Sequence, residues 1–177
     1  MSGRELLDFD AGALYEALDT ERRARGLSWQ AVADGLWELS SELNRRRRDH
    51  PISPSTLTGM RRRRATSCQH ALFMLRWLDR TPESFLTGAT PPAGRPLPTA
   101  GPDRRLRWDL SSLYDAMNGE RQRRGLGWGE LAAVLGCTPS QLRGLRTARF
   151  ATGMGVAMRI VQWLERPAAD FVYAARW

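Results

Sequence analysis

The chain has 177 residues, a formal net charge of +8 and an isoelectric point near 11, and all 27 of its Lys-or-Arg positions are arginine. This length accommodates one ordinary domain or two small ones, and the apolar content of 42% argues against a disordered chain. The positive charge favours a polyanionic partner.

The first half of the chain is repeated in the second half. Residues 14–33 (LYEALDTERRARGLSWQAVA) align without a gap with residues 113–132 (LYDAMNGERQRRGLGWGELA), and residues 53–61 (SPSTLTGMR) align with residues 138–146 (TPSQLRGLR). Each copy spans roughly 70–85 residues, which is a domain length rather than a solenoid period. The sequence therefore predicts two copies of one small domain.

The first copy carries an insertion. The offset between the copies changes from 99 (residue 14 to 113) to 85 (residue 53 to 138), so 14 extra residues lie at about residues 37–51. The beginning of the insertion, WELSSEL, continues a helical pattern, and the remainder, NRRRRDHP, is predicted to be a basic loop. A second arginine run at residues 61–64 follows the repeated segment, so two basic clusters bracket one predicted helix.

A proline-rich stretch separates the copies. Residues 87–107 hold five of the ten prolines, and Leu97 and Leu106 are their only large apolar residues. Proline at this density opposes both helix formation and strand pairing, so a semi-extended linker is predicted. The linker divides the chain into a first domain, residues 1–86, and a second domain, residues 108–177.

The second copy shows the start and stop signals of its first two helices. Asp109 precedes an apolar pattern at helical spacing, and Gly125 ends that helix because glycine readily adopts the left-handed conformation of a helix stop. The next helix carries Trp128 on its inner face and ends at Gly136.

Three further helices are predicted in the second copy. Thr138 is an N-cap, Pro139 occupies the first helical position, and Gln141 completes a capping box. A fourth helix is predicted over about residues 152–163, and a last short helix is predicted to carry Phe171 and Val172. Because no stretch alternates with a period of two over a useful length, no strand is predicted and the fold class is all-α.

Residues 131–145 (LAAVLGCTPSQLRGL) resemble the helix-turn-helix of the lambda-repressor/Cro-like (XRE) family. Ala132 is small where the two helices of such a motif cross, Gly136 occupies the turn, and leucines fill the buried positions. The resemblance covers nearly all of residues 109–174 and, apart from the insertion, residues 11–86. It implies two domains of about five helices each, with the third helix of a domain in the major groove of double-stranded DNA.

The resemblance places base-reading positions on the third helix of each copy. Proline and glycine lack side-chain donors, so the serine, threonine and arginine positions are the expected readers, above all Arg143, because arginine to guanine is the commonest specific contact. The base-reading positions are Pro139, Ser140, Arg143 and Gly144 in the second copy, and Pro54, Ser55, Thr58 and Gly59 in the first. The other expected DNA-contacting residues are Arg45, Arg46, Arg47, Arg48, Arg61, Arg62, Arg63, Arg64, Arg146 and Arg149.

The chain departs from the family pattern in two ways. Family members often pair an arginine of the first helix with a glutamate after the third helix, but Arg61 and Arg146 occupy the place of that glutamate. Glu21 and Glu120, in the first helices, are the candidates to reverse the pair. The insertion also interrupts the tight turn of the first copy, which leaves open whether this copy binds DNA or a protein partner.

Few residues indicate other chemistry. The cysteines, Cys68 and Cys137, form no disulfide framework and have no neighbours at metal-ligand spacing, so neither a metal nor another cofactor is expected. The N-terminus carries no secretion signal, and no apolar run approaches the roughly 18 residues of a membrane span, so we expect a cytoplasmic protein with no membrane partner. Cys137 is expected to be a small core residue.

The sequence predicts a DNA-binding transcription regulator with tandem helix-turn-helix domains and no catalytic residues. The alternative is a protein-interaction regulator in which the first domain binds a protein and only the second binds DNA. A nuclease is least favoured because the acidic residues are scattered. The chain is expected to act on DNA as a covalent pseudo-dimer, or as a homodimer sealed by residues 171–177.

Overall fold

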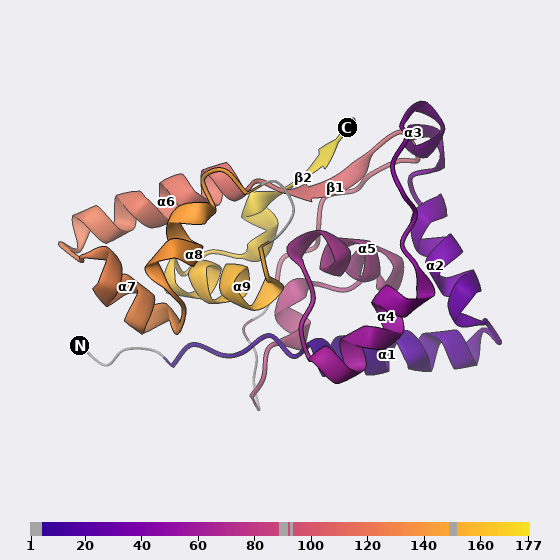
Figure 1. Ribbon diagram of the computed structural model, residues 1–177, viewed down its shortest axis with the longest axis horizontal. Helices are drawn as coiled ribbons and strands as arrows, with labels where there is room; N and C mark the ends of the chain where they lie inside the picture. Colours follow the sequence, from indigo (N-terminus) through magenta and orange to yellow (C-terminus); the bar gives the residue numbers. More distant parts are fainter. Residues whose placement is uncertain (1–4, 89–91, 93, 149–151) are drawn as a thin grey trace.

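The computed structural model describes residues 5–88, 92, 94–148 and 152–177, and it is mostly helical with one short sheet (Figure 1). The N-terminal unit, residues 5–88, contains α1 (Ala11–Ala24), α2 (Trp29–Glu38), α3 (Ser41–Arg46), α4 (Pro54–Arg63), α5 (Cys68–Leu78) and the 3-10 helix η1 (Pro82–Phe85). The C-terminal unit, residues 105–177, contains β1 (Arg105–Trp108), α6 (Leu110–Arg123), α7 (Trp128–Leu135), α8 (Pro139–Gly144), α9 (Met154–Trp163), the 3-10 helix η2 (Ala168–Phe171) and β2 (Val172–Ala175).

The two units repeat one order of helices. The bounds of α1 and α6 lie 99 residues apart at both ends, α4 and α8 start 85 residues apart, and α5 and α9 start 86 residues apart. Asp10 and Asp109 cap the first helix of each unit by accepting a hydrogen bond from the backbone amide three residues on. Only α3, in the insertion, has no counterpart among the described elements of the C-terminal unit.

The start of α8 follows the predicted capping box. The Thr138 hydroxyl accepts from the Gln141 amide at 3.2 Å, and the Gln141 side-chain oxygen accepts from the Thr138 amide at 2.8 Å. Two of the amides that the first turn leaves without partners are thereby satisfied. Gly136 ends α7 as predicted, and with φ of +60° it adopts the left-handed conformation.

We expect Gly136→Ala to lower the free energy of unfolding by about 1–2 kcal/mol, because a left-handed conformation strains any residue with a Cβ. The added Cβ would also lie 2.5 Å from Nη1 of Arg159, which donates to the carbonyls of Leu135 and Gly136. Urea denaturation measures the change. Gly129→Ala in α7 is the matched control and should leave the stability unchanged or raise it, because no atom lies within 4 Å of its added Cβ. Equal losses in the two variants would contradict this account.

The prediction that the chain has no strand is wrong. β1 and β2 pair antiparallel, with Trp108 opposite Val172 and Arg105 opposite Ala175. The N-terminal unit has a single bridge, Phe9 to Leu86, at the corresponding place. The sequence of β1, RLRW, does alternate polar and apolar residues, but only over four positions at the end of the proline-rich stretch, and all four residues are buried.

The described part of the proline-rich stretch is fixed against the N-terminal unit. Residues 94–101 form neither helix nor strand, but the carbonyl of Pro102 accepts hydrogen bonds from the amides of Glu42 and Leu43. Residues 105–107, the end of the predicted linker, belong to β1. The prediction of a semi-extended linker without strand pairing is therefore wrong at this end, and the chain between the units is not a free tether.

Equivalent segments of the two units contact each other. The amide of Cys68 donates to the carbonyl of Thr152 at 2.8 Å, and the amide of Met154 donates to the carbonyl of Thr66 at 2.9 Å. Cys68 is equivalent to Met154, and Thr66 to Thr152, because the members of each pair are 86 residues apart. Each unit therefore donates one hydrogen bond and accepts the equivalent one, as the protomers of a two-fold dimer do.

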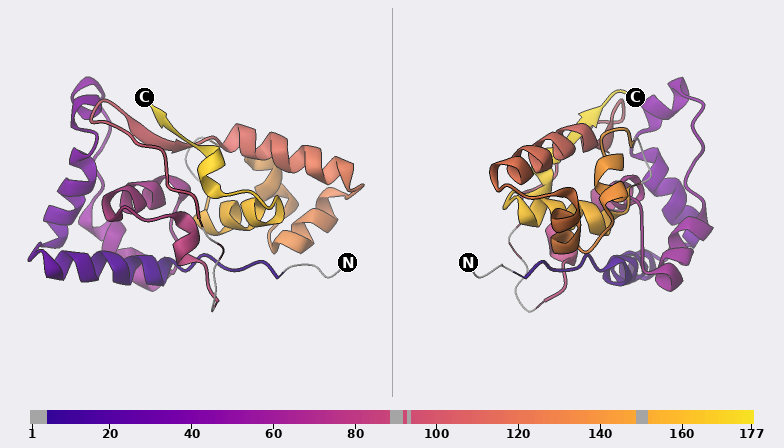
Figure 2. Two further views of the ribbon diagram at one scale, coloured as in Figure 1. Left: turned by 180° about the vertical axis from the view of Figure 1, so that it is seen from behind. Right: turned by 60° about the vertical axis from the view of Figure 1, so that its left-hand side comes forward.

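The segment that precedes the first helix of each unit contacts the other unit, at α9 or at α5. The side chain of Gln162, in α9, donates to the carbonyl of Leu7, and the side chain of Gln69, in α5, donates to the carbonyl of Leu106. Figures 1 and 2 show the indigo N-terminal segment running along the C-terminal unit before it reaches α1. Buried apolar residues of both units form one core cluster, which fixes the units relative to each other.

Three predicted element boundaries need correction. The fourth helix of the C-terminal unit starts at Met154 rather than at residue 152, and the last short helix is the 3-10 helix η2, which ends before Val172. The insertion is helical as far as Arg46, so the basic loop is shorter than predicted. Phe171 and Val172 are buried and close the core of this chain.

Candidate nucleic-acid interface

The helix α8 buries its apolar side and exposes the predicted base-reading positions. Leu142 is fully buried, whereas Ser140, Arg143 and Gly144 are exposed and Pro139 is half-buried. No described atom lies within 4 Å of a Cβ built on Gly144. This glycine therefore faces open space rather than a neighbouring helix of the described chain.

The helix α4 presents the equivalent surface. Leu57 is buried, whereas Ser55 and Thr58 are exposed. Gly59 is half-buried, because the guanidinium of Arg63 folds back over it and donates to the carbonyl of Thr56 at 3.2 Å. The absence of a side chain at position 59 thus leaves room for the Arg63 guanidinium, a contact that the sequence pattern does not indicate.

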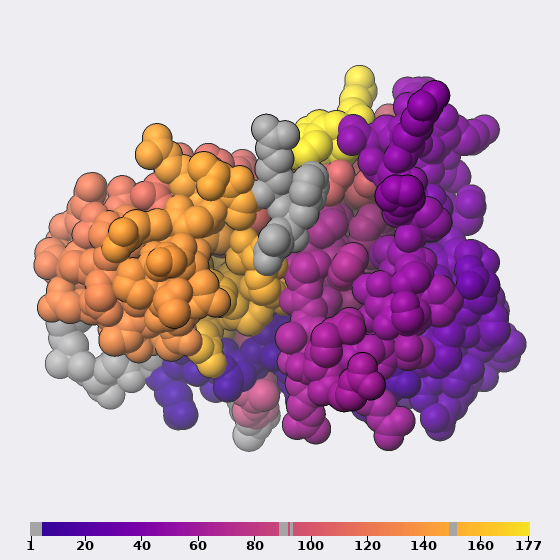
Figure 3. Space-filling view, viewed as in Figure 1, coloured from indigo at the N-terminus to yellow at the C-terminus, as the bar shows by residue number. Residues whose placement is uncertain are grey.

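The helices α4 and α8 lie on the same face of the molecule. In the space-filling view of Figure 3, α8 lies in the orange part of this face and α4 in the magenta part. Neither the segment of residues 53–64 nor that of residues 138–148 contains an acidic residue. This face therefore carries two equivalent helices and no carboxylate on either of them.

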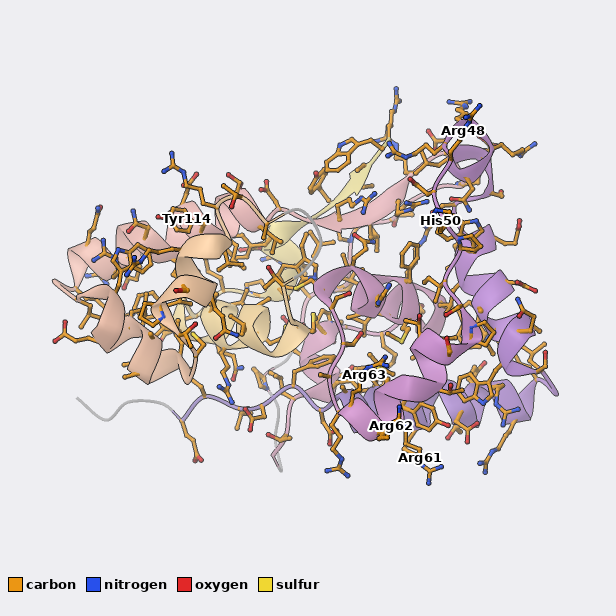
Figure 4. The ribbon with its side chains drawn as sticks, viewed as in Figure 1. Arg48, His50, Arg61, Arg62, Arg63 and Tyr114 are labelled. Carbon is orange, nitrogen blue, oxygen red and sulfur yellow. The ribbon has the colours of Figure 1, made fainter. Side chains whose placement is uncertain are left out.

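One arginine cluster lies at and after the end of α3, and the other lies at the end of α4. Figure 4 shows Arg48 beside α3 at the top of the view and Arg61, Arg62 and Arg63 at α4 below it. Arg61 to Arg63 form the last turn of α4, where positive charge also stabilises the helix dipole. These arginines therefore lie at the end of α4 opposite to its N-terminal part. Arg149 lies outside the described residues.

The arginines of this face differ from those of the first helices in their pairing. The arginines at the C-terminal ends of α1 and α6 mostly pair with carboxylates: Arg22 and Arg23 with Asp19, Arg25 with Glu21, and Arg123 and Arg124 with Glu120. The hydrogen bonds from Arg123 and Arg124 lower the pKa of Glu120 to about 2. Within the described residues, no ion pair is made by Arg45, Arg46, Arg48, Arg61, Arg62, Arg63, Arg64, Arg143 or Arg146.

The proposed reversal of the family ion pair is wrong. Glu21 pairs with Arg25 and Glu120 with Arg123 and Arg124, so neither reaches the arginine after the third helix. Arg121 instead donates to the carbonyl of Leu126 at 2.6 Å, as its counterpart in α1 does to the equivalent carbonyl. Glu21 and Glu120 instead pair with arginines three or four residues further along the chain, since neighbours at this spacing lie on one helix face.

The insertion supplies fewer free arginines than predicted. Arg47 pairs with Asp49 at 2.9 Å, and Nε of Arg45 donates weakly to the carbonyl of Ser41 at 3.4 Å. Arg46 and Arg48 make no hydrogen bond or ion pair with the described part of the chain. Of residues 45–48, Arg46 and Arg48 are thus the two whose guanidinium groups have no hydrogen-bond or ion-pair partner among the described residues.

The described residues hold no group of three His, Cys, Asp or Glu that could bind a metal ion. Burial raises the pKa of the Cys68 thiol to about 12, and burial also raises the pKa of the half-buried Cys137. Both thiols are therefore poor nucleophiles at neutral pH. Among the helices that the structure describes, none is long and apolar enough to cross a membrane.

Comparison of the chain with protein-family models, with curated proteins and with solved structures finds no match in any of the three. The functional interpretation therefore depends on the residues and their geometry.

Proposed function

We propose that the chain is a sequence-specific DNA-binding transcription regulator with two helix-turn-helix units of the lambda-repressor type. The observation that carries the proposal is the set of unpaired arginines beside two equivalent, acid-free helices on one face. Elsewhere in the chain arginines are mostly satisfied by nearby carboxylates or carbonyls, so unpaired guanidinium groups on one face are available for an external polyanion.

The N-terminal parts of α4 and α8 are the proposed base readers. In α8 the exposed Ser140 and Arg143 supply donors, and in α4 the exposed Ser55 and Thr58 do so. A major groove accepts one helix, and a bidentate guanidinium favours guanine. Arg143 of α8 and Thr58 of α4 occupy equivalent positions. Because these two side chains differ, the two half-sites are expected to be related but unequal.

The chain is proposed to act as a covalent pseudo-dimer. Its two units contact each other through equivalent segments, as the protomers of a two-fold dimer do. Dimeric proteins of this class bind half-sites about 34–36 Å apart, one turn of DNA. The fixed contact between the units replaces a flexible tether as the means of setting this spacing.

Replacing Arg143 with alanine should weaken binding to the preferred duplex by about 1–3 kcal/mol and relax the preference at one base pair. A binding titration against the preferred duplex and single-base variants measures both effects. Arg146→Ala is the matched control: it should weaken binding to all sequences alike and reduce the salt slope by about 1. A uniform loss for Arg143→Ala would assign this residue to a phosphate instead.

The alternative, in which the N-terminal unit binds a protein, is favoured by the inserted α3, which interrupts the connection between α2 and α4. The double variant Ser55→Ala, Thr58→Ala separates the two functions. DNA binding by both units predicts a loss of affinity and preference at one half-site. Unchanged DNA binding would favour the protein-interaction role for that unit.

A further inference from the structure

The guanidinium of Arg63, labelled in Figure 4, lies at the proposed base-reading surface of α4, although its backbone belongs to the last turn of that helix. We call this surface, which Ser55, Thr58 and Gly59 form, the α4 reading surface. A Cβ built on Gly59 would lie 2.5 Å from Nη1 and 3.0 Å from Cζ of Arg63. Nη2 of Arg63 donates to the carbonyl of Thr56 at 3.2 Å. Side chains of a helix tilt toward its N-terminus, so an arginine in the last turn can reach back over the preceding turns.

The folded-back side chain borders an open hollow of about 390 Å³ on α4. The lining combines the N-terminal half of the helix with two arginines of its last turn: Ser55, Thr56, Thr58, Gly59, Arg62 and Arg63. The hydroxyl-bearing Ser55 and Thr58 are exposed. The Arg63 guanidinium therefore shares one concave surface with the side chains that are proposed to read bases.

The guanidinium of Arg63 keeps most of its hydrogen-bonding capacity. A guanidinium carries five N–H groups, and the bond to the carbonyl of Thr56 uses one of them. Arg63 is exposed and makes no ion pair with the described residues. Burial, followed by the charge of Arg63, lowers the pKa of His70, so this imidazole is neutral at pH 7 and does not repel the guanidinium. The remaining donors are therefore available to an acceptor outside the chain.

The equivalent helix α8 carries its guanidinium at a different position of the repeat. Under the offset of 85 residues, Arg143 of α8 is equivalent to Thr58 of α4, and Ala148 is equivalent to Arg63. The glycine of α8, Gly144, has no described atom within 4 Å of its built Cβ. Each helix thus brings one guanidinium to its reading surface, from a position that is not an arginine in the other copy.

We propose that Arg63 reads a base in the half-site bound by the N-terminal unit, and that Gly59 leaves the space in which its guanidinium lies. Arginine donates two parallel hydrogen bonds to O6 and N7 of guanine, so guanine is the preferred base. Because the guanidinium lies over position 59 and Arg143 is equivalent to position 58, the two guanines are expected at non-equivalent base pairs of the two half-sites. This inference rests on the proposed DNA-binding function and names one of its specificity-determining residues.

Arg63→Ala tests the contact in titrations of the intact chain against the preferred duplex and its single-base variants. Discrimination should fall by about 5–150-fold at one base pair of the half-site that Arg143→Ala leaves unchanged, which is the effect of losing one bidentate base contact. Arg61→Ala is the matched control, because Arg61 belongs to the same helix turn but does not line the hollow. It should weaken binding to all duplexes alike and leave the discrimination unchanged.

Gly59→Ala tests the position of the guanidinium without removing a charge. The added methyl group would displace the far end of the flexible Arg63 side chain, so the fold should persist. The variant should lose discrimination at the same base pair as Arg63→Ala and keep the salt slope of the parent. The double variant should match Arg63→Ala alone within about twofold, because both changes remove the same contact.

Urea denaturation tests the geometry without DNA. Gly119→Ala in α6 should raise the midpoint, because no described atom lies within 4 Å of its added Cβ and alanine favours a helix interior. Gly59→Ala should raise the midpoint less, because it displaces Arg63 from the carbonyl of Thr56. In the Arg63→Ala background, Gly59→Ala should produce the full increase.

A uniform loss of affinity in Arg63→Ala, like that of Arg61→Ala, would overturn the inference and assign the guanidinium to a phosphate. Tighter binding by Gly59→Ala would also overturn it, because Arg63 would then cover the reading surface and have to leave it. Equal midpoint gains in Gly59→Ala and Gly119→Ala would contradict the position of the guanidinium over Gly59. A parent chain that prefers no duplex would instead refute the proposed function, and the inference with it.

Discussion

Replacing Arg61, Arg62 and Arg146 together with glutamine is expected to weaken binding to every duplex by about 10²–10³-fold at 0.1 M salt. Each phosphate contact contributes about 0.9 to the slope of log affinity against log salt, so three contacts correspond to somewhat less than three decades at this concentration. None of these three arginines makes an ion pair within the described chain. Titrations at several salt concentrations measure both the affinity and the slope.

A second triple variant, Arg23→Gln, Arg25→Gln and Arg123→Gln, removes the same charge from the paired arginines. These side chains have carboxylate partners on their own helices. The variant should lose less affinity and keep most of the salt slope, because net charge acts at long range but makes no phosphate contact. Equal losses in the two triple variants would mean that binding follows net charge and has no defined face.

Replacing Arg76 with methionine is expected to lower the free energy of unfolding by about 2–4 kcal/mol, since hydrogen bonds to a charged group would be lost and their acceptors left unpaired. The guanidinium of Arg76 donates to the carbonyls of Leu39 at 2.7 Å and Ala100 at 2.6 Å and to the Ser40 hydroxyl at 3.0 Å. It also bonds the carbonyls of Gly101 and Arg104. Burial, followed by the charge of Arg105, lowers the pKa of Arg76, so desolvation offsets part of this gain.

Urea denaturation of the intact chain measures the effect of Arg76→Met. Arg80→Met is the control, because Arg80 is exposed and lies 5.0 Å from the ring of Phe85. Its replacement should cost less than about 1 kcal/mol. A loss of similar size in both variants would contradict a structural role of Arg76 in holding residues 100–104 against α2 and α3.

The elements that could be predicted from the sequence depend on neighbours in the chain. The capping box of Thr138 and Gln141 and the helix end at Gly136 are set within a few residues, and both predictions are confirmed. The repeat itself aligned the remaining helices, since similar sequences start their helices at equivalent positions, although α7 and α8 end earlier than α2 and α4 do.

The features that could not be predicted depend on distant partners. The strand β1 exists because Val172–Ala175 pairs with it more than sixty residues later, and its arginines are buried by α5 and the insertion. The Arg76 contacts join three segments that no local pattern connects. The family ion pair was also mispredicted, because acidic neighbours on the same helix compete for each arginine.

The mass of the complex between the intact chain and a duplex selected from a random pool tests the central claim most directly. Sedimentation equilibrium gives the number of chains per duplex, and the selected sequences give the motif. We predict one chain on a motif of two related, unequal halves about one helical turn apart. Two chains on a symmetric site, or selection that recovers no motif at moderate salt, would contradict the account.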